Sequence, residues 1–442
     1  MKESSTGSRL AIGAIWSLAG SVAARLFGIV ASVFVARALG KSGFGEFGVI
    51  QSTVAMFQIF AGFGLGLTAT KYIAEYRTSD PHRVSRMLGL SLFGACFTGV
   101  LTGTALYLSS NWLATNFLVA PQLKAVLQLS SVLLLLGGIT GTQTGALAGF
   151  EKFHSIARVN FLSGALNCLF VILATIIAGL QGAVIGLIAG MLATLALNHL
   201  TLNAVYGETN IRPSLVGFWS EYSVLWRFSL PAVLSGLLVT PAIWLCNAML
   251  VHRPDGYGEM GILNAANQWR AAILFLPGVV EMIILPVIAN LRGEGNWASY
   301  RKVLLYNVYF NGAIALAATL FISLFAPIIL KGYGDGFESG RWVLVVLCLS
   351  GVLATISNVT AQLLASEDKM WWGMLLNLVW AATLIGSSSL YVHKGAYGLA
   401  LASLIAYGVH LVISLLLSIY LVNAKRSEIE SNAQKATPCE VL

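Results

Sequence analysis

The stretch FGEFGVIQ, residues Phe44–Gln51, decides the fold of this 442-residue chain because it occurs twice. The second copy, YGEMGILN, is Tyr257–Asn264, and it lies 213 positions later, about half the length of the chain. Each copy opens a long apolar stretch. A duplicated half is typical of transporters in which two similar helical bundles move against each other. The repeat therefore predicts a protein built from two related halves.

The composition indicates an integral membrane protein. Hydrophobic residues make up 57% of the chain and charged residues only 10%, whereas a soluble domain carries about 25% charged residues. A helix needs about 20 apolar residues to cross the hydrocarbon core, and only helices or closed barrels satisfy their backbone amides in lipid. We predict twelve helical spans, at residues 10–37, 46–70, 87–108, 123–149, 157–179, 182–205, 223–250, 260–289, 302–326, 340–365, 371–392 and 395–422.

Further landmarks recur in the same order in both halves. Leu147–Lys152 ends the fourth predicted span, and Leu364–Lys369 ends the tenth. The sixth and twelfth spans open with Gly182-Ala183 and Gly395-Ala396. Because six spans per half is an even number, the two halves share one orientation and are related by an axis along the membrane normal.

The predicted fold class is therefore an all-α integral membrane protein with two six-helix bundles. The predicted boundaries place the N-terminal bundle at 1–205, a cytoplasmic linker at 206–222, the C-terminal bundle at 223–422 and a polar, disordered cytoplasmic tail at 423–442.

The net charge of +8 reflects topology rather than nucleic-acid binding. With twelve spans both termini lie on one side, and most of the Lys and Arg residues between spans lie on that side too. Positive residues mark the cytoplasmic face, so we expect a multi-pass protein of the cell (inner) membrane with both termini in the cytoplasm. The first span carries Arg25 and Arg37 and is too long for a signal peptide, so we expect it to stay in the mature protein.

Arg25 lies midway along the first predicted span, on one helical face with Ser21 and other small residues. An arginine at this depth costs about 3 kcal/mol on insertion scales, so it faces a cavity or a partner rather than lipid. One interpretation is a polar cavity face, and the alternative is a charge paired to a neighbouring helix. Arg37 lies at the outer end of the same span, where it either lines the cavity or extends to the interface.

A second intramembrane arginine, Arg270, lies in the eighth span in a polar run with Asn264 and Asn267. Glu281 follows on the same side of the predicted helix, three turns or about 16 Å away, which is too far for a direct ion pair. Arg270 therefore needs another anion. The alternative is a structural link between Arg270 and Glu281 through water or another helix.

The segment 35–48, VARALGKSGFGEFG, resembles the junction of the first two spans in bacterial polysaccharide flippases of the O-antigen and teichuronic type. These proteins belong to the multidrug/oligosaccharidyl-lipid/polysaccharide exporter superfamily. The segment 148–153, AGFEKF, and the Gly-Ala openings of the sixth and twelfth spans resemble that family too. The likeness extends over almost the whole chain, about residues 5–422.

The resemblance implies a V-shaped pair of six-helix bundles that opens alternately to either side of the membrane. It implies transport of an oligosaccharide on a polyprenyl pyrophosphate to the outer leaflet for surface polysaccharide assembly. By the same resemblance Arg25 and Arg270 would bind the pyrophosphate, and the cavity-lining candidates are Ser21, Asn264, Asn267, Glu281 and Arg37. The implied partners are the lipid-linked oligosaccharide, membrane lipids and the polysaccharide assembly enzymes. We expect a monomer with no cofactor, no metal and no catalytic residue.

Two other functions compete with this prediction. A cation-coupled multidrug exporter of the same superfamily would place carboxylates in its cavity, whereas these spans carry one deep Glu and at least two deep Arg. A membrane polysaccharide polymerase or ligase would need a large catalytic loop. The predicted loops do not exceed about 20 residues, which argues against an enzyme.

Overall fold

The computed structural model describes residues 6–229, 233, 237–293, 297–366 and 370–436, and every regular element in these ranges is helical. The first half of the chain forms α1 (Thr6–Gly62), α2 (Leu65–Tyr76), α3 (Pro81–Trp112), α4 (Lys124–Ser130), α5 (Val132–Gly149) and α6 (Phe153–Thr209). The second half forms α8 (Val239–Val251), α9 (Gly256–Gly293), α10 (Trp297–Tyr333), α11 (Arg341–Ser366), α12 (Met370–Tyr391) and α13 (Gly395–Ala436).

Short turns of tighter or wider helix connect these elements. They are η1 (Leu113–Phe117), η2 (Pro121–Leu123), η3 (Phe218–Glu221), η4 (Leu225–Ser229), η5 (Glu338–Gly340) and η6 (Val392–Lys394).

Two long helices are bent by glycine. Helices α1 and α6 each have 57 residues, which would give a straight rod of about 85 Å, far longer than a bilayer is thick. Helix α1 turns at Gly40, whose φ is +71°, and α6 turns at Ala178 and Gly179, where Gly179 has φ +56°. A positive φ favours glycine because it has no Cβ. Each bend therefore separates two helical legs that follow one another in the chain.

Seven helical segments of the described chain are long and apolar enough to cross a membrane. Three of them, residues 20–76, 153–209 and 371–418, contain more than one leg, because each includes a bend or a short connection. The chain is thus an all-helical membrane protein. The number of crossings remains a prediction.

The predicted disorder of the C-terminal tail is wrong over most of its length. Helix α13 continues without a break to Ala436, past the predicted end of the last span at residue 422. The tail is rich in Ala, Glu, Lys and Arg, which favour helix, and Arg426 precedes Glu430 by one helical turn. Residues 437–442 lie outside the described ranges.

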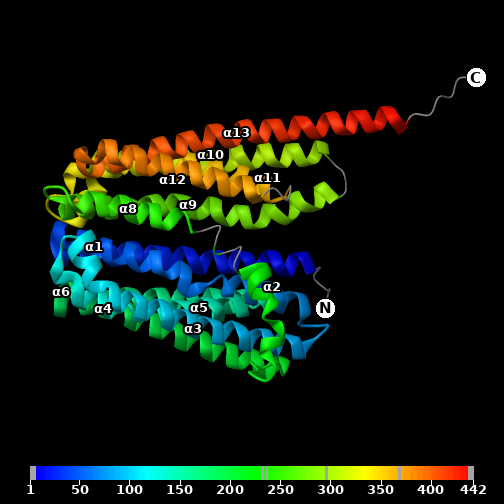
Figure 1. The fold of residues 1–442 in the computed structure, drawn as a ribbon, viewed down its shortest axis with the longest axis horizontal. Helices are drawn as coiled ribbons and strands as arrows, with labels where there is room; N and C mark the ends of the chain where they lie inside the picture. Colours follow the sequence, from blue (N-terminus) through cyan, green and yellow to red (C-terminus); the bar gives the residue numbers. More distant parts are fainter. Residues whose placement is uncertain (1–5, 230–232, 234–236, 294–296, 367–369, 437–442) are drawn as a thin grey trace, which may run out of the picture.

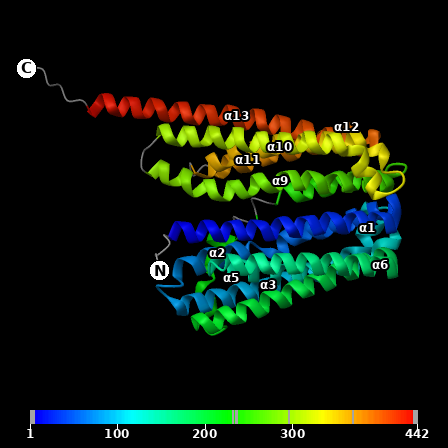
Figure 2. The same cartoon turned by 180° about the vertical axis from the view of Figure 1, so that it is seen from behind.

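The helices lie in two groups, as Figures 1 and 2 show from opposite sides. Helices α1–α6 lie together, α8–α13 lie together, and α1 packs against α9 at the boundary. The start of α1 and the end of α13 lie at the same end of the molecule, on the right in Figure 1. The domain boundaries themselves stay a prediction.

The segment between the two groups is attached to the first one. Glu221 is buried and accepts hydrogen bonds from Arg83 Nε at 3.2 Å and Arg86 Nη2 at 3.0 Å. The backbone N–H of Ser214 donates to the carbonyl of Ser85 at 2.9 Å. The linker is therefore held against α3, so it moves with the first group of helices.

We expect Glu221→Gln to release this linker. A buried carboxylate that pairs with two guanidinium groups is costly to lose, because both cations lose their counter-charge. Hydrogen exchange of the peptide covering 212–222 should become faster by roughly tenfold or more, if the lost contact is worth about 1.5–3 kcal/mol. The matched control is Glu208→Gln, which removes an exposed pair with Lys152. Unchanged exchange in the Glu221 variant would show that the ion pair does not hold the linker.

Candidate functional site

The two copies of the repeated stretch pack directly against each other. A Cβ built on Gly45 would overlap the carbonyl oxygen of Tyr257, and one built on Gly261 would overlap the carbonyl oxygen of Lys41. A Cβ on Gly48 would come within 2.8 Å of the Asn264 side chain. The glycines therefore let the backbones of α1 and α9 touch, as small residues do between membrane helices. The two repeated stretches thus form part of the contact between the two groups of helices.

Aromatic side chains close the same end of the molecule. Phe44, Tyr333 and Phe337 are almost fully buried, with ring centroids 5.7–6.1 Å apart. Trp244 Nε1 donates to Thr53 Oγ1 across the boundary at 2.9 Å. This end, opposite the described ends of α1 and α13, is a buried, mainly aromatic contact between the two groups.

Arg25 lies on α1 at the boundary between the groups. Its Nη2 donates to the backbone carbonyl of Gln268 on α9 at 3.0 Å, and its Nε is buried without a hydrogen-bond partner. The side chain is only partly buried. The described ion pairs do not include Arg25. Among the described contacts, the guanidinium thus has no anionic partner and one buried donor that is unused.

Arg270 lies two residues beyond Gln268 on α9 and therefore points to a different side of this helix. It lines a cavity of about 130 Å³ inside the second group of helices. Its guanidinium carbon lies 5.0 Å from the centre of the Tyr407 ring, a cation–π distance. Both Nε and Nη2 are buried without a hydrogen-bond partner.

The structure therefore gives Arg25 and Arg270 separate surroundings, although both are associated with α9. Arg25 contacts the backbone of α9 from outside, and Arg270 faces the interior of the second group. Of the cavity candidates, Asn267 lines the same cavity as Arg270. A shared pyrophosphate site of Arg25 and Arg270 stays a prediction.

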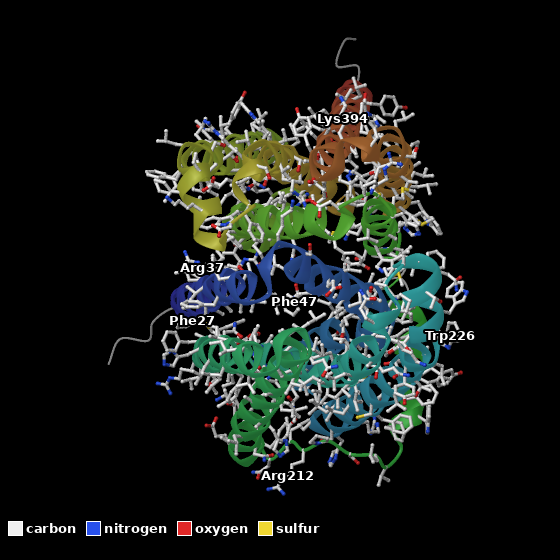
Figure 3. The ribbon with its side chains drawn as sticks, turned by 90° about the vertical axis from the view of Figure 1, so that its left-hand side faces the viewer. Phe27, Arg37, Phe47, Arg212, Trp226 and Lys394 are labelled. Carbon is white, nitrogen blue, oxygen red and sulfur yellow. The ribbon has the colours of Figure 1, made fainter. Side chains whose placement is uncertain are left out.

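The other candidates take different positions. Ser21 Oγ accepts a hydrogen bond from Asn160 Nδ2 on α6 at 3.2 Å, within the first group. Asn264 is buried in the contact of the repeated stretches. Arg37 is exposed, and its Nε donates to the Gly332 carbonyl at 2.6 Å; Figure 3 shows it at the boundary between the two groups. Glu281 belongs to α9, but its side chain lies outside the described residues.

Sequence reasoning missed the aromatic lining of the Arg270 cavity. Tyr407 and Trp380 come from α13 and α12, far from Arg270 in sequence, and their rings lie 5.3 Å apart. Both resemble ordinary helix-packing aromatics in an apolar span. No sequence signal links them to Arg270, because the link depends on how three helices pack.

Comparison with known proteins places the chain in a family. Residues 10–292 match the family of polysaccharide biosynthesis proteins. The chain is 24% identical to the EPS I polysaccharide export inner membrane protein EpsE of Ralstonia nicotianae, over 89% of this chain and 90% of that protein. It is 21% identical to a putative O-antigen transporter of Shigella flexneri, over 91% and 95% of the two chains.

Solved structures share the fold. An inward-facing multidrug resistance MATE family transporter of the MOP superfamily has a TM-score of 0.75 and 17% identity, over 94% of this chain and 99% of that one. A MOP superfamily transporter from Pyrococcus furiosus has a TM-score of 0.70 and 17% identity, over 94% and 96%. The all-helical fold is thus that of MOP superfamily transporters, and the chain belongs to the polysaccharide biosynthesis protein family.

Proposed function

We propose that this protein is a flippase that carries a polyprenyl-pyrophosphate-linked oligosaccharide from the cytoplasmic to the outer leaflet of the inner membrane. The observation that carries the proposal is Arg25, a partly buried guanidinium with one unused buried donor at the boundary between the two groups of helices. An anionic head group would satisfy it. The relatives named for polysaccharide export and O-antigen transport support this substrate class.

The movement follows from the duplicated architecture. We propose twelve crossings in two six-helix bundles, with both termini in the cytoplasm. The packed contact of the repeated stretches closes the end away from the termini. With the termini in the cytoplasm, this closed end would face the outer leaflet. Transport then requires this contact to open while the cytoplasmic end closes, which is alternating access.

Arg25 and Arg270 would hold the pyrophosphate during this movement. A guanidinium stays charged in a partly dry cavity and offers forked donors to phosphate oxygens. Helix α9 carries both Arg270 and the Gln268 carbonyl that Arg25 contacts. A shift of α9 relative to α1 would release Arg25 from that carbonyl and turn its donors to the head group.

The runner-up, a cation-coupled multidrug exporter, lacks comparable support in the described part of the chain. The cavity in the second group is lined by Arg270 and amide, hydroxyl and aromatic side chains, with no carboxylate among the lining residues. A cation would be repelled there. Because the related proteins are transporters, we do not propose an enzyme.

Reconstitution of the purified protein in liposomes tests the proposal. We expect it to move a polyprenyl-pyrophosphate oligosaccharide between leaflets at least tenfold faster than protein-free liposomes, because the charged head group has a large barrier to crossing lipid unaided. A polyprenyl-linked sugar without phosphate is the matched control, and the protein should accelerate its movement less, relative to protein-free liposomes. Equal acceleration of both lipids by the protein would contradict the anion site. Uptake of organic cations driven by a sodium gradient would favour the multidrug exporter.

A further inference from the structure

We propose that the cavity around Arg270 binds a small monovalent inorganic anion such as chloride in the cargo-free protein. The cavity lies inside the second group of helices, between α8, α9, α11, α12 and α13. The inference deepens the proposed function, since it assigns a resident counter-ion to a cation that the cargo would later contact, but the site stands on its own geometry.

The cavity presents hydrogen-bond donors that have no partner. Arg270 Nε and Nη2 are buried atoms without a partner, and a buried donor without an acceptor is costly. Trp380 also lines the cavity, its side chain is 3% exposed, and its indole N–H has no partner. An indole nitrogen donates only, so it cannot serve a cation. Both groups therefore require an acceptor or an anion.

The remaining lining chemistry also favours a negative ion. Asn247 and Asn267 contribute amides that can donate, and Ser388, Ser403 and Tyr407 contribute hydroxyls. Arg270 is the one ionised side chain among the lining residues, so the lining carries a positive charge. Cation sites in proteins use carboxylate and carbonyl oxygens, and the lining carries no carboxylate.

The cavity is large enough for a hydrated halide. Its volume of about 130 Å³ is well above the roughly 10–15 Å³ that one water needs on the same measure. A halide with a few waters therefore fits this space. The Arg270 guanidinium lies over the face of the Tyr407 ring. This cation–π contact helps to keep Arg270 in position while an anion binds or leaves.

The test is equilibrium binding of radioactive chloride, added as the choline salt, to the purified protein in detergent. We expect saturable binding that an excess of bromide displaces. Arg270→Gln should weaken binding roughly tenfold or more, since it removes a charged donor. Trp380→Phe keeps an aromatic side chain but removes the indole N–H, and should weaken binding several-fold. Arg270→Lys keeps the charge and should retain part of the affinity.

The matched control is Arg341→Gln, which removes another arginine that lies over an aromatic ring, Trp342, but is exposed. It should bind chloride like the parent protein. Each variant must elute as one monodisperse species; if Arg270→Gln does not, the Trp380 variant decides. No saturable chloride binding, or saturable sodium binding that Arg270→Gln strengthens, would overturn the proposal. Chloride binding without lipid transport would instead reject the proposed function and leave this site standing.

Discussion

Gly45→Ala is expected to force apart the two halves at the end where the repeated stretches meet. The new methyl group would overlap the carbonyl oxygen of Tyr257, which is backbone and cannot rotate away. Overpacking of this kind costs about 1–3 kcal/mol, so the ratio of closed to open molecules at this end should fall roughly five- to 150-fold. The same substitution at Gly261, against the Lys41 carbonyl, should act in the same direction.

Double electron–electron resonance measures this opening as a distance between two spin labels. Spin labels at Ser42 and Glu338, both exposed near the contact and in opposite halves, should show a longer distance population in Gly45→Ala, in a background without the native cysteines. The matched control is Gly386→Ala on α12, where an added Cβ has nothing within 4 Å. That control should be neutral or stabilising by up to about 1 kcal/mol, because Ala favours helix over Gly. An unchanged distance distribution in Gly45→Ala would refute the role of this glycine contact.

The same contact shows how far sequence alone reaches. The repeat, the apolar spans and the glycine-rich junctions predicted a duplicated helical membrane protein, and the fold and family comparisons confirm the helical fold and the family. Hydrophobic period and length report on each helix by itself. They do not report which helix a given face meets, so the mutual packing of the repeats at Gly45 and Gly261 could not be predicted.

The candidate site shows the same limit at the level of side chains. The depth of Arg25 and Arg270 in apolar segments was enough to identify both as functional candidates. Their partners were not visible: Arg25 contacts a backbone carbonyl, and any residue at position 268 offers one. Arg270 meets Tyr407 only because α13 packs beside α9. The break at Gly40, by contrast, falls between the first two predicted spans, 10–37 and 46–70, so the sequence did indicate it.

Arg25→Ala is expected to abolish export of the surface polysaccharide. Hydrogen bonds between charged groups contribute about 1.5–3 kcal/mol each. The loss of a forked pair to the pyrophosphate should therefore slow transport roughly a hundredfold or more. Cells should accumulate lipid-linked oligosaccharide in the cytoplasmic leaflet while the variant is still inserted in the membrane, measured by lipid extraction and by an immunoblot of membranes. Arg25→Lys should retain part of the activity, because it keeps the charge but loses the fork.

Arg158→Ala is the matched control, since Arg158 is exposed on α6 and its loss should leave export unchanged. Arg270→Ala separates two arrangements of the anion site. If both arginine variants stop export, the pyrophosphate needs charges from both halves, which requires α9 to move relative to α1. If only Arg25→Ala does, the head group is held at the boundary alone and Arg270 serves the cavity of the second half. Normal polysaccharide in both variants would contradict the anion site, because the pyrophosphate would then cross the membrane without either guanidinium.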